Sequence, residues 1–217
     1  MLIGHYAPAL ILQRARPSLK LWQLFVAVQL VDLGWALCVL AGVEKLRIVP
    51  GFTASNDLDL WFMPYTHSLL ATAVWSLLAF LGWLALGRPG TRVGDAVVVA
   101  VAVASHFVLD FVVHAHDLPL AGGGRVKLGL GLWSYKWAAV FVECGLFVVA
   151  ALWWWRGQRQ PARGIGWTLG GMTAFAVASF FVPTPPSATM MALTGLATWV
   201  ALPLLVGWQA ATPLATA

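Results

Sequence analysis

The chain has 217 residues, of which 60% are hydrophobic and only 10% are charged. Soluble globular domains carry about 25% charged residues, so this composition excludes an ordinary soluble enzyme or binding domain. The formal net charge is +5, but the basic residues lie in short segments between apolar runs, where membrane proteins normally carry them. The positive charge is therefore explained by the membrane spans and does not call for a nucleic-acid partner.

Six apolar runs are long enough to cross a bilayer, which takes about 20 helical residues. In chain order these runs are Leu21–Gly42, Trp61–Gly87, Ala96–Ala115, Trp133–Trp155, Ile165–Val182 and Ala188–Trp208. They predict an all-α membrane protein, a bundle of about six transmembrane helices in a single polytopic domain that covers residues 1–217. The apolar segment Ile3–Gln13 is too short to span and predicts a short N-terminal helix that is interfacial or re-entrant.

The ionisable residues divide the chain unevenly. All eight acidic residues and all five histidines lie before position 144, and no charged residue follows Arg163. We therefore place the functional site in residues 1–150 and expect residues 164–217 to form uncharged scaffold helices. Eight basic residues flank the spans on one side and five on the other, so the positive-inside rule favours a cytoplasmic location for both termini.

Two ionisable residues share the third apolar run as His106-x-x-x-Asp110. Carboxylate and imidazole groups are costly inside a bilayer, so they are rare there and usually functional. The i, i+4 spacing places both side chains on one helix face, roughly 6 Å apart along the axis. A helix uses this spacing to offer two ligands to one metal ion, although His106 alone could simply hydrogen-bond to a neighbouring helix.

Three further ionisable residues, Asp32, His67 and Glu143, fall in other predicted spans at similar depths. At about 1.5 Å per residue, all three lie in one slab with the His106–Asp110 pair, between the midplane and the outer boundary. Each has a simpler explanation: Asp32 could cap a broken helix, His67 could begin an interfacial helix, and Glu143 could be a neutral buried acid. Imidazole nitrogens with carboxylates suit Zn²⁺, with Mn²⁺ or Fe²⁺ as alternatives, so the slab predicts a divalent-metal site.

Several short motifs, taken in order, resemble those of a known family. They are Gly4-His5, Asp32 in the next apolar segment, Tyr65-Thr66-His67-Ser68-Leu69 and His106-x-x-x-Asp110. This ordered set is similar to the membrane-bound metal-dependent hydrolase family of bacterial inner-membrane proteins. Three other segments resemble a large, mostly uncharacterised subgroup of that family: Leu46-Arg47-Ile48-x-Pro50-Gly51, His114-x-x-Asp117-Leu118-Pro119-Leu120 and Lys127-Leu128-Gly129-Leu130-Gly131-Leu132-Trp133.

The resemblance covers roughly residues 1–150 and implies a multi-pass protein of the bacterial inner membrane that binds a metal. It departs from the family pattern at two places. The family often has two acids as Asp-x-Asp, whereas Asp32 is followed by Leu33 and Gly34. The family's His-Arg-Gly-x-Thr-His is reduced here to a segment that ends in Thr66-His67 and has one histidine and no arginine. Both departures favour one metal ion over two.

The leading hypothesis is a metal-dependent hydrolase that acts on a lipid-like or amphiphilic ester or phosphoester. Its expected metal ligands are His67, His106, Asp110, Asp32 and His5. Glu143 is the expected general base, because burial can tune a carboxyl to accept a proton near neutral pH. His114 and Asp117 lie at the membrane edge and would support the ligands or the loop, and Arg125 and Lys127 would attract an anionic head group.

The same residues allow other functions. Intramembrane acids and histidines can relay protons, so a proton- or cation-coupled transporter is the first alternative. A haem or quinone protein is the second, because paired transmembrane histidines can ligate haem. In every case membrane lipids are expected partners, and the enzyme hypothesis adds a small amphiphilic substrate.

Overall fold

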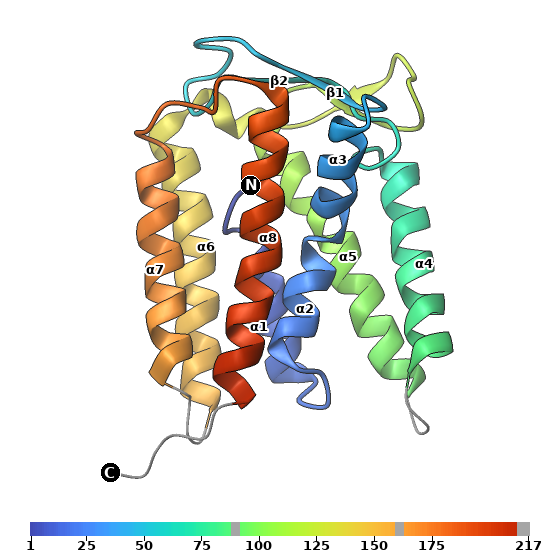
Figure 1. Ribbon diagram of the computed structural model, residues 1–217, viewed down its shortest axis with the longest axis vertical. Helices are drawn as coiled ribbons and strands as arrows, with labels where there is room; N and C mark the ends of the chain where they lie inside the picture. The colour runs from blue at the N-terminus through green and yellow to red at the C-terminus, as the bar shows by residue number, and fades with distance from the viewer. Residues whose placement is uncertain (88–91, 159–162, 212–217) are drawn as a thin grey trace.

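The computed structural model describes residues 1–87, 92–158 and 163–211, and within these ranges eight α-helices form one bundle (Figure 1). The helices are α1 (Tyr6–Ala15), α2 (Leu21–Val28), α3 (Leu30–Leu40), α4 (Leu69–Leu86), α5 (Val93–Val113), α6 (Lys136–Gly157), α7 (Arg163–Ser179) and α8 (Ala188–Ala211). A short 3-10 helix, η1 (Leu132–Ser134), precedes α6. The predicted all-helical bundle is therefore present, with small strands added at one end.

Four helices, α4, α5, α6 and α8, are long and apolar enough to cross a membrane. The α2–α3 pair can count as a fifth span, although its two halves meet at an angle of 48°. Six spans are not confirmed, because α7, in the predicted run Ile165–Val182, has only 17 residues. Figure 1 shows α7 running beside α6 over most of the height of the bundle.

The N-terminal helix α1 lies inside the bundle. It packs against α2, α5 and α6, and its residues Tyr6, Ala7, Ala9 and Leu10 are buried. Figure 1 shows the N-terminus about halfway along the bundle, with α1 running from there toward the end opposite the strands. The predicted short N-terminal helix is therefore present, and it is packed inside the bundle.

The second predicted span begins later than expected. Trp61 and Phe62 belong to strand β2 (Leu58–Phe62), which pairs antiparallel with β1 (Lys45–Ile48). Pro64 lacks a backbone N–H and ends the strand pairing, and α4 starts only after Ser68, whose Oγ accepts from the N–H of Ala71 at 3.0 Å. Residues 61–68, predicted to begin the second span, therefore form the end of a strand and a turn instead of a helix.

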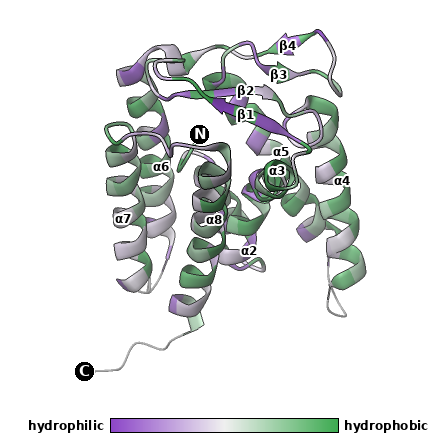
Figure 2. Cartoon of the chain, turned by 45° about the horizontal axis from the view of Figure 1, so that its top comes forward, coloured by the Kyte–Doolittle hydropathy of each residue, from purple (hydrophilic) through white to green (hydrophobic). Residues whose placement is uncertain are grey.

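The strands close one end of the bundle. Strands β3 (Leu118–Pro119) and β4 (Lys127–Leu128) form a second hairpin beside β1 and β2. Figure 2 shows hydrophilic residues in these strands, whereas the helices are mostly hydrophobic.

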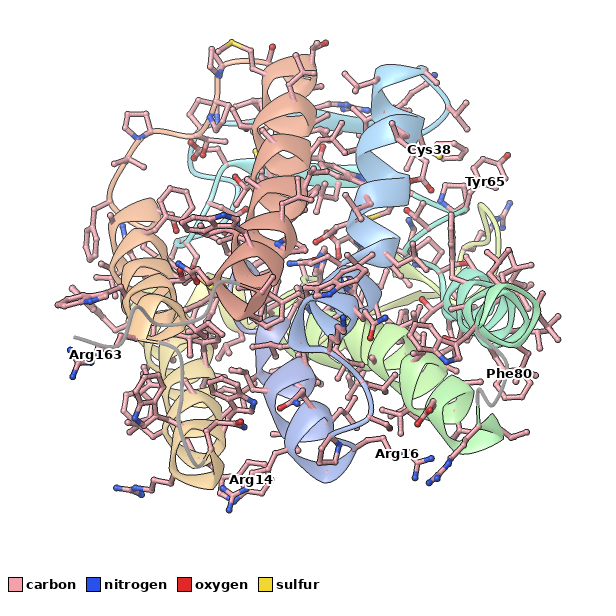
Figure 3. The ribbon with its side chains drawn as sticks, turned by 60° about the horizontal axis from the view of Figure 1, so that its bottom comes forward. Arg14, Arg16, Cys38, Tyr65, Phe80 and Arg163 are labelled. Carbon is pink, nitrogen blue, oxygen red and sulfur yellow. The ribbon has the colours of Figure 1, made fainter. Side chains whose placement is uncertain are left out.

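Basic residues gather at the opposite end, where Figure 3 labels Arg14, Arg16 and Arg163. Arg16 Nε lies 2.6 Å from Asp95 Oδ1, which ties the chain after α1 to the first turn of α5. Arg14 lies over the ring of Trp153 on α6, 3.9 Å from the ring centroid. These contacts fasten this end of the bundle. Two residues predicted for the same side, Arg88 and Arg159, lie outside the described residues.

The apolar core consists of two clusters, and the buried polar residues lie at the junction between them. Along α3, Val31 belongs to one cluster and Trp35 to the other, with Asp32 between them in the chain. Along α5, Val103 and Phe107 are divided in the same way on either side of His106. The interruption of the core therefore coincides with the predicted metal site.

Candidate metal centre

The break between α2 and α3 places two groups at the centre. The last carbonyls of a helix have no intrahelical partner, and the carbonyl of Val28 instead faces His106 Nδ1 at 2.8 Å. Asp32 falls in the first turn of α3, where the helix dipole stabilises a negative charge. One interruption of the helix thus positions a carboxylate and orients an imidazole.

Four of the predicted ligands converge from three elements: Asp32 from α3, His67 from the turn before α4, and His106 and Asp110 from α5. His67 Nε2 lies 3.2 Å from Asp32 Oδ1 and 3.6 Å from Asp110 Oδ2. His106 Nε2 lies 3.5 Å from the same oxygen of Asp32 and 3.1 Å from Asp110 Oδ2. Adjacent ligands of a tetrahedral Zn²⁺ ion are roughly 3.3–3.5 Å apart at ordinary bond lengths. The four measured separations bracket that value.

The hydrogen bonds around the histidines fix which ring nitrogen faces the centre. A carbonyl can only accept a hydrogen bond, so His106 carries its proton on Nδ1 when the ring is neutral. His114 Nδ1 lies 3.0 Å from Asp117 Oδ1 and is a donor for the same reason. In both rings Nε2 is left with a lone pair that points toward Asp110. Metal-binding histidines are usually held in this way by an acceptor on the outer nitrogen.

The centre is consequently rich in acceptors. Asp32 and Asp110 are 8% and 1% exposed, and they contribute only oxygen acceptors when ionised. His106 Nε2 is buried and makes no hydrogen bond within the described residues, although two carboxylates lie nearby. Lone pairs that crowd together without a shared proton are stabilised by a cation. The residues His67, His106 and Asp110 could hold a metal ion, and so could His5, Asp32 and His106.

His5 lies against the same centre from the N-terminal segment. Its ring stacks on that of His106, with centroids 3.8 Å apart and planes inclined by 6°. His5 Nε2 lies 3.0 Å from Asp110 Oδ1, and the amino group of Met1 lies 3.0 Å from the same oxygen. The structure therefore brings the fifth predicted ligand to the centre as well, on the far oxygen of Asp110.

His114, predicted to lie at the membrane edge, directly follows α5 and is buried against the centre. It is 2% exposed, and its Nε2 lies 3.7 Å from Asp110 Oδ1. The positions 106, 110 and 114 share one helical spacing, which is the signal that sequence reasoning did not use. Gly129 fixes the turn: a Cβ there would lie 1.9 Å from the oxygen of Ala115, so only glycine allows this close approach.

Gly34, two residues after Asp32, lies in close contact with its surroundings. A Cβ at Gly34 would lie 2.9 Å from Cζ2 of Trp75 and 3.6 Å from Cγ2 of Thr66. Gly34 thus lets α3 approach the turn that carries His67.

Glu44 is a buried acid that the sequence analysis overlooked. Its Oε1 accepts from the N–H groups of Tyr65 and Thr66 at 2.7 and 3.0 Å, and its Oε2 accepts from the Thr66 hydroxyl at 2.6 Å. The Thr66 hydroxyl, having donated to Glu44, accepts from His67 Nδ1 at 2.8 Å. Glu44 therefore orients His67 through Thr66. Its place at the end of a span, where acids are unremarkable, concealed this role.

We expect Glu44→Ala to weaken metal binding by 10–100-fold without removing it, because outer hydrogen-bond partners of a ligand carry about that much affinity. Thr66→Val should have a similar effect, and the double variant should be little worse than either single one, because both changes break the same chain. Competition with a fluorescent chelator measures the affinities. Losses of metal affinity that add up in the double variant would contradict the hydrogen-bond chain from Glu44 through Thr66 to His67.

Glu143 occupies a different part of the site. Its Oε1 accepts hydrogen bonds from the N–H groups of Leu2 and Ile3, the latter at 2.8 Å. The side chain is 2% exposed and contributes to the wall of a cavity that also reaches Asp32 and Asp110. Glu143 therefore holds the N-terminal segment in place while it faces the space beside the metal ligands.

The two predicted head-group residues lie away from the cavity wall. Arg125 is exposed. Lys127 donates to the carbonyl of Asp117 at 3.1 Å, and so fastens the loop that orients His114. Neither residue belongs to the lining of the cavity, so the structure gives them no direct contact with a molecule bound there.

The cavity has a volume of about 540 Å³ and a polar inner end. His67 and His114 lie at that end, together with Asp32, Asp110 and Glu143. Most of the remaining wall is apolar and comes partly from α7 and α8, through Phe175 and Trp199 among others. The uncharged helices thus help to form the site as well as supporting it. The indole N–H groups of Trp35 and Trp199 are buried in this wall without a partner among the described residues.

The comparisons with known proteins add no relative. No family model matches the chain, no curated protein is significantly similar to it, and no solved structure matches it. The chemical argument therefore rests on the geometry of the site.

Proposed function

We propose that this chain is a membrane-embedded, metal-dependent hydrolase of the bacterial inner membrane, with the basic end of the bundle, near Arg14 and Arg16, toward the cytoplasm. The N-terminus itself, predicted to be cytoplasmic, lies inside the bundle against Asp110. The observation that supports it best is the convergence of two histidine nitrogens and two carboxylates at tetrahedral spacing in an apolar core. Such a cluster is costly inside a bilayer unless it is used. Nitrogen and oxygen ligands together favour Zn²⁺, with Mn²⁺ or Fe²⁺ next.

In the proposed reaction two histidines and an aspartate bind the metal ion, and Glu143 transfers a proton. His67, His106 and Asp110 would hold the ion with Asp32 beside them, which leaves one position open for water. The ion would supply a Lewis acid for water activation and for carbonyl or phosphoryl polarisation. Glu143 takes a proton from the attacking water and passes it to the leaving alcohol. The ester C–O or P–O bond breaks, the acid product keeps the hydroxyl, and the apolar wall excludes other water.

The shape of the cavity favours an amphiphilic ester as the substrate. A polar end that carries the ligands and an apolar wall that carries Leu58, Leu60 and Phe180 suit a molecule with a reactive head and a hydrocarbon tail. Membrane lipids have this form and reach a buried site without leaving the bilayer. The activated water would attack the carbonyl carbon of a carboxylic ester or the phosphorus of a phosphoester.

Metal-dependent hydrolysis is the test of this function. Protein purified in mild detergent and stripped with a chelator should hydrolyse a panel of acyl esters and phosphoesters only after Zn²⁺, Mn²⁺ or Fe²⁺ is restored. Protein refilled with Mg²⁺, a poor ion for imidazole ligands, is the matched control. Full hydrolysis by the stripped protein, or none with any metal across the panel, would contradict the proposal.

A cation-coupled carrier is the second candidate, favoured by the 48° break between α2 and α3. Broken helices carry the ion sites of many transporters. Proteoliposomes would then show cation uptake that depends on His106 and Asp110 but no hydrolysis. The haem alternative fits less well, because the rings of His5 and His106 are in direct contact at 3.8 Å and leave no space for an iron between them.

A further inference from the structure

A second cavity of about 370 Å³ lies between the N-terminal segment, α7 and α8. Its wall includes Ile3 and Tyr6 from the N-terminal part, Met172 from α7, and Leu202 and Leu205 from α8. No residue of this wall is charged. The space is therefore suited to hydrocarbon rather than to an ion or a polar head.

The second cavity adjoins the first. Leu2, Phe175, Thr198 and Trp199 line both spaces, so these four side chains form the boundary between them. The metal ligands Asp32 and Asp110 lie in the wall of the first cavity. The apolar space between α7 and α8 thus lies directly beside the cavity that holds the ligands, with Phe175 and Trp199 between them.

The space between α7 and α8 is closed at one end and open at its side. Thr168 donates a hydrogen bond to Gln209 Oε1 at 3.0 Å and joins the two helices at the end away from the strands. Above this contact, Gly171 is exposed, and a Cβ built on it meets no atom within 4 Å. Phe175, four residues further on, is 53% exposed. The opening therefore faces outward, where a bilayer would lie.

The geometry points to a specific occupant: the acyl chain of a lipid ester, held between α7 and α8 while its ester group reaches the metal ligands. This inference rests on the proposed hydrolase function and narrows its substrate class to acyl esters with a long chain. Thr168 to Phe175 spans roughly 10 Å of helix, enough for several methylenes. The unpartnered indole N–H of Trp199 at the boundary is a donor for the ester oxygen.

Chain-length selectivity follows from this binding mode. Each methylene that packs in the cavity should lower KM until the chain reaches the contact between Thr168 and Gln209. The gain should be well below the roughly fourfold that transfer out of water would give, because a lipid chain comes from hydrocarbon. Esters with longer acyl chains should show no further decrease in KM. Acetyl esters, which do not reach past Phe175, should be unaffected by changes in α7.

Gly171→Leu tests this binding mode directly, with Gly170→Leu as its matched control. Both glycines have open space around a built Cβ, and only Gly171 lines the cavity. Both changes favour the helix equally. We expect Gly171→Leu to raise KM for a long-chain ester by at least 10-fold and to leave an acetyl ester unchanged, whereas Gly170→Leu changes neither. Equal effects of the two variants on the long-chain ester would overturn the inference.

A binding measurement separates this inference from the hydrolase function itself. A glycerol ether with a photoreactive diazirine in its alkyl chain cannot be hydrolysed and needs no activity as a readout. It should label Met172, Phe175 or Leu202 in the wild-type protein and lose that labelling in Gly171→Leu. Such labelling without any hydrolysis would support the chain site and refute the enzyme. Labelling elsewhere, or labelling unchanged by Gly171→Leu, would refute the chain site.

Discussion

Replacing His106 or Asp110 by alanine should reduce metal affinity by more than about 100-fold, beyond the 10–100-fold that outer-sphere changes cost. His106 belongs to both groups of residues that could hold an ion, and Asp110 offers oxygens to four histidines. Hydrolysis should fall in parallel, since a centre without its ion activates no water.

His116→Ala is the matched control for these two variants. His116 is exposed at the end of α5, only two residues from His114, and takes no part in the centre. Elemental analysis and chelator competition on the purified proteins measure the effect, and circular dichroism checks that each bundle is folded. Normal metal content in both folded variants would show that α5 carries no metal site.

Glu143→Gln should keep the bound metal and lower kcat by 10²–10⁴-fold, the usual contribution of a general base. The structure makes this substitution informative, because a glutamine oxygen can still accept from the N–H groups of Leu2 and Ile3. The N-terminal segment therefore stays in place, and only the capacity to take a proton is lost.

Glu143→Ala completes the comparison. It removes the acceptor as well as the base, so the N–H groups of Leu2 and Ile3 lose their partner and His5 loses its support. We expect the alanine variant to bind metal more weakly and to unfold at lower temperature than the glutamine variant. A glutamine variant with full kcat would limit Glu143 to anchoring the N-terminal segment. A glutamine variant without metal would make it a ligand.

The sequence predicted the helical bundle because long apolar runs have few other solutions in a membrane. It placed the start of α4 eight residues early, since Trp61 and Phe62 are as suitable for a buried strand as for a helix. It also did not reveal the break at Gln29 between α2 and α3. No proline or glycine marks that position, and the break is visible only in the packed bundle.

The depth argument predicted the neighbourhood of Asp32, His67 and the His106–Asp110 pair, because helix rise converts sequence position into height in the membrane. It could not predict lateral contacts, which depend on how the helices pack. Glu44 was missed for this reason: its link to His67 passes through Thr66 in a turn. The closeness of His114 to Asp110 was missed as well, because it depends on the turn that Gly129 holds.

The metal content of the wild-type protein tests the central claim most directly. The protein should be purified in mild detergent, incubated with Zn²⁺, Mn²⁺ and Fe²⁺ in turn, passed through gel filtration and analysed for bound elements. The proposed centre predicts about one divalent ion per chain for the preferred metal, held by three protein ligands with one position open to water. A folded, monodisperse protein that retains none of the three ions would contradict the account.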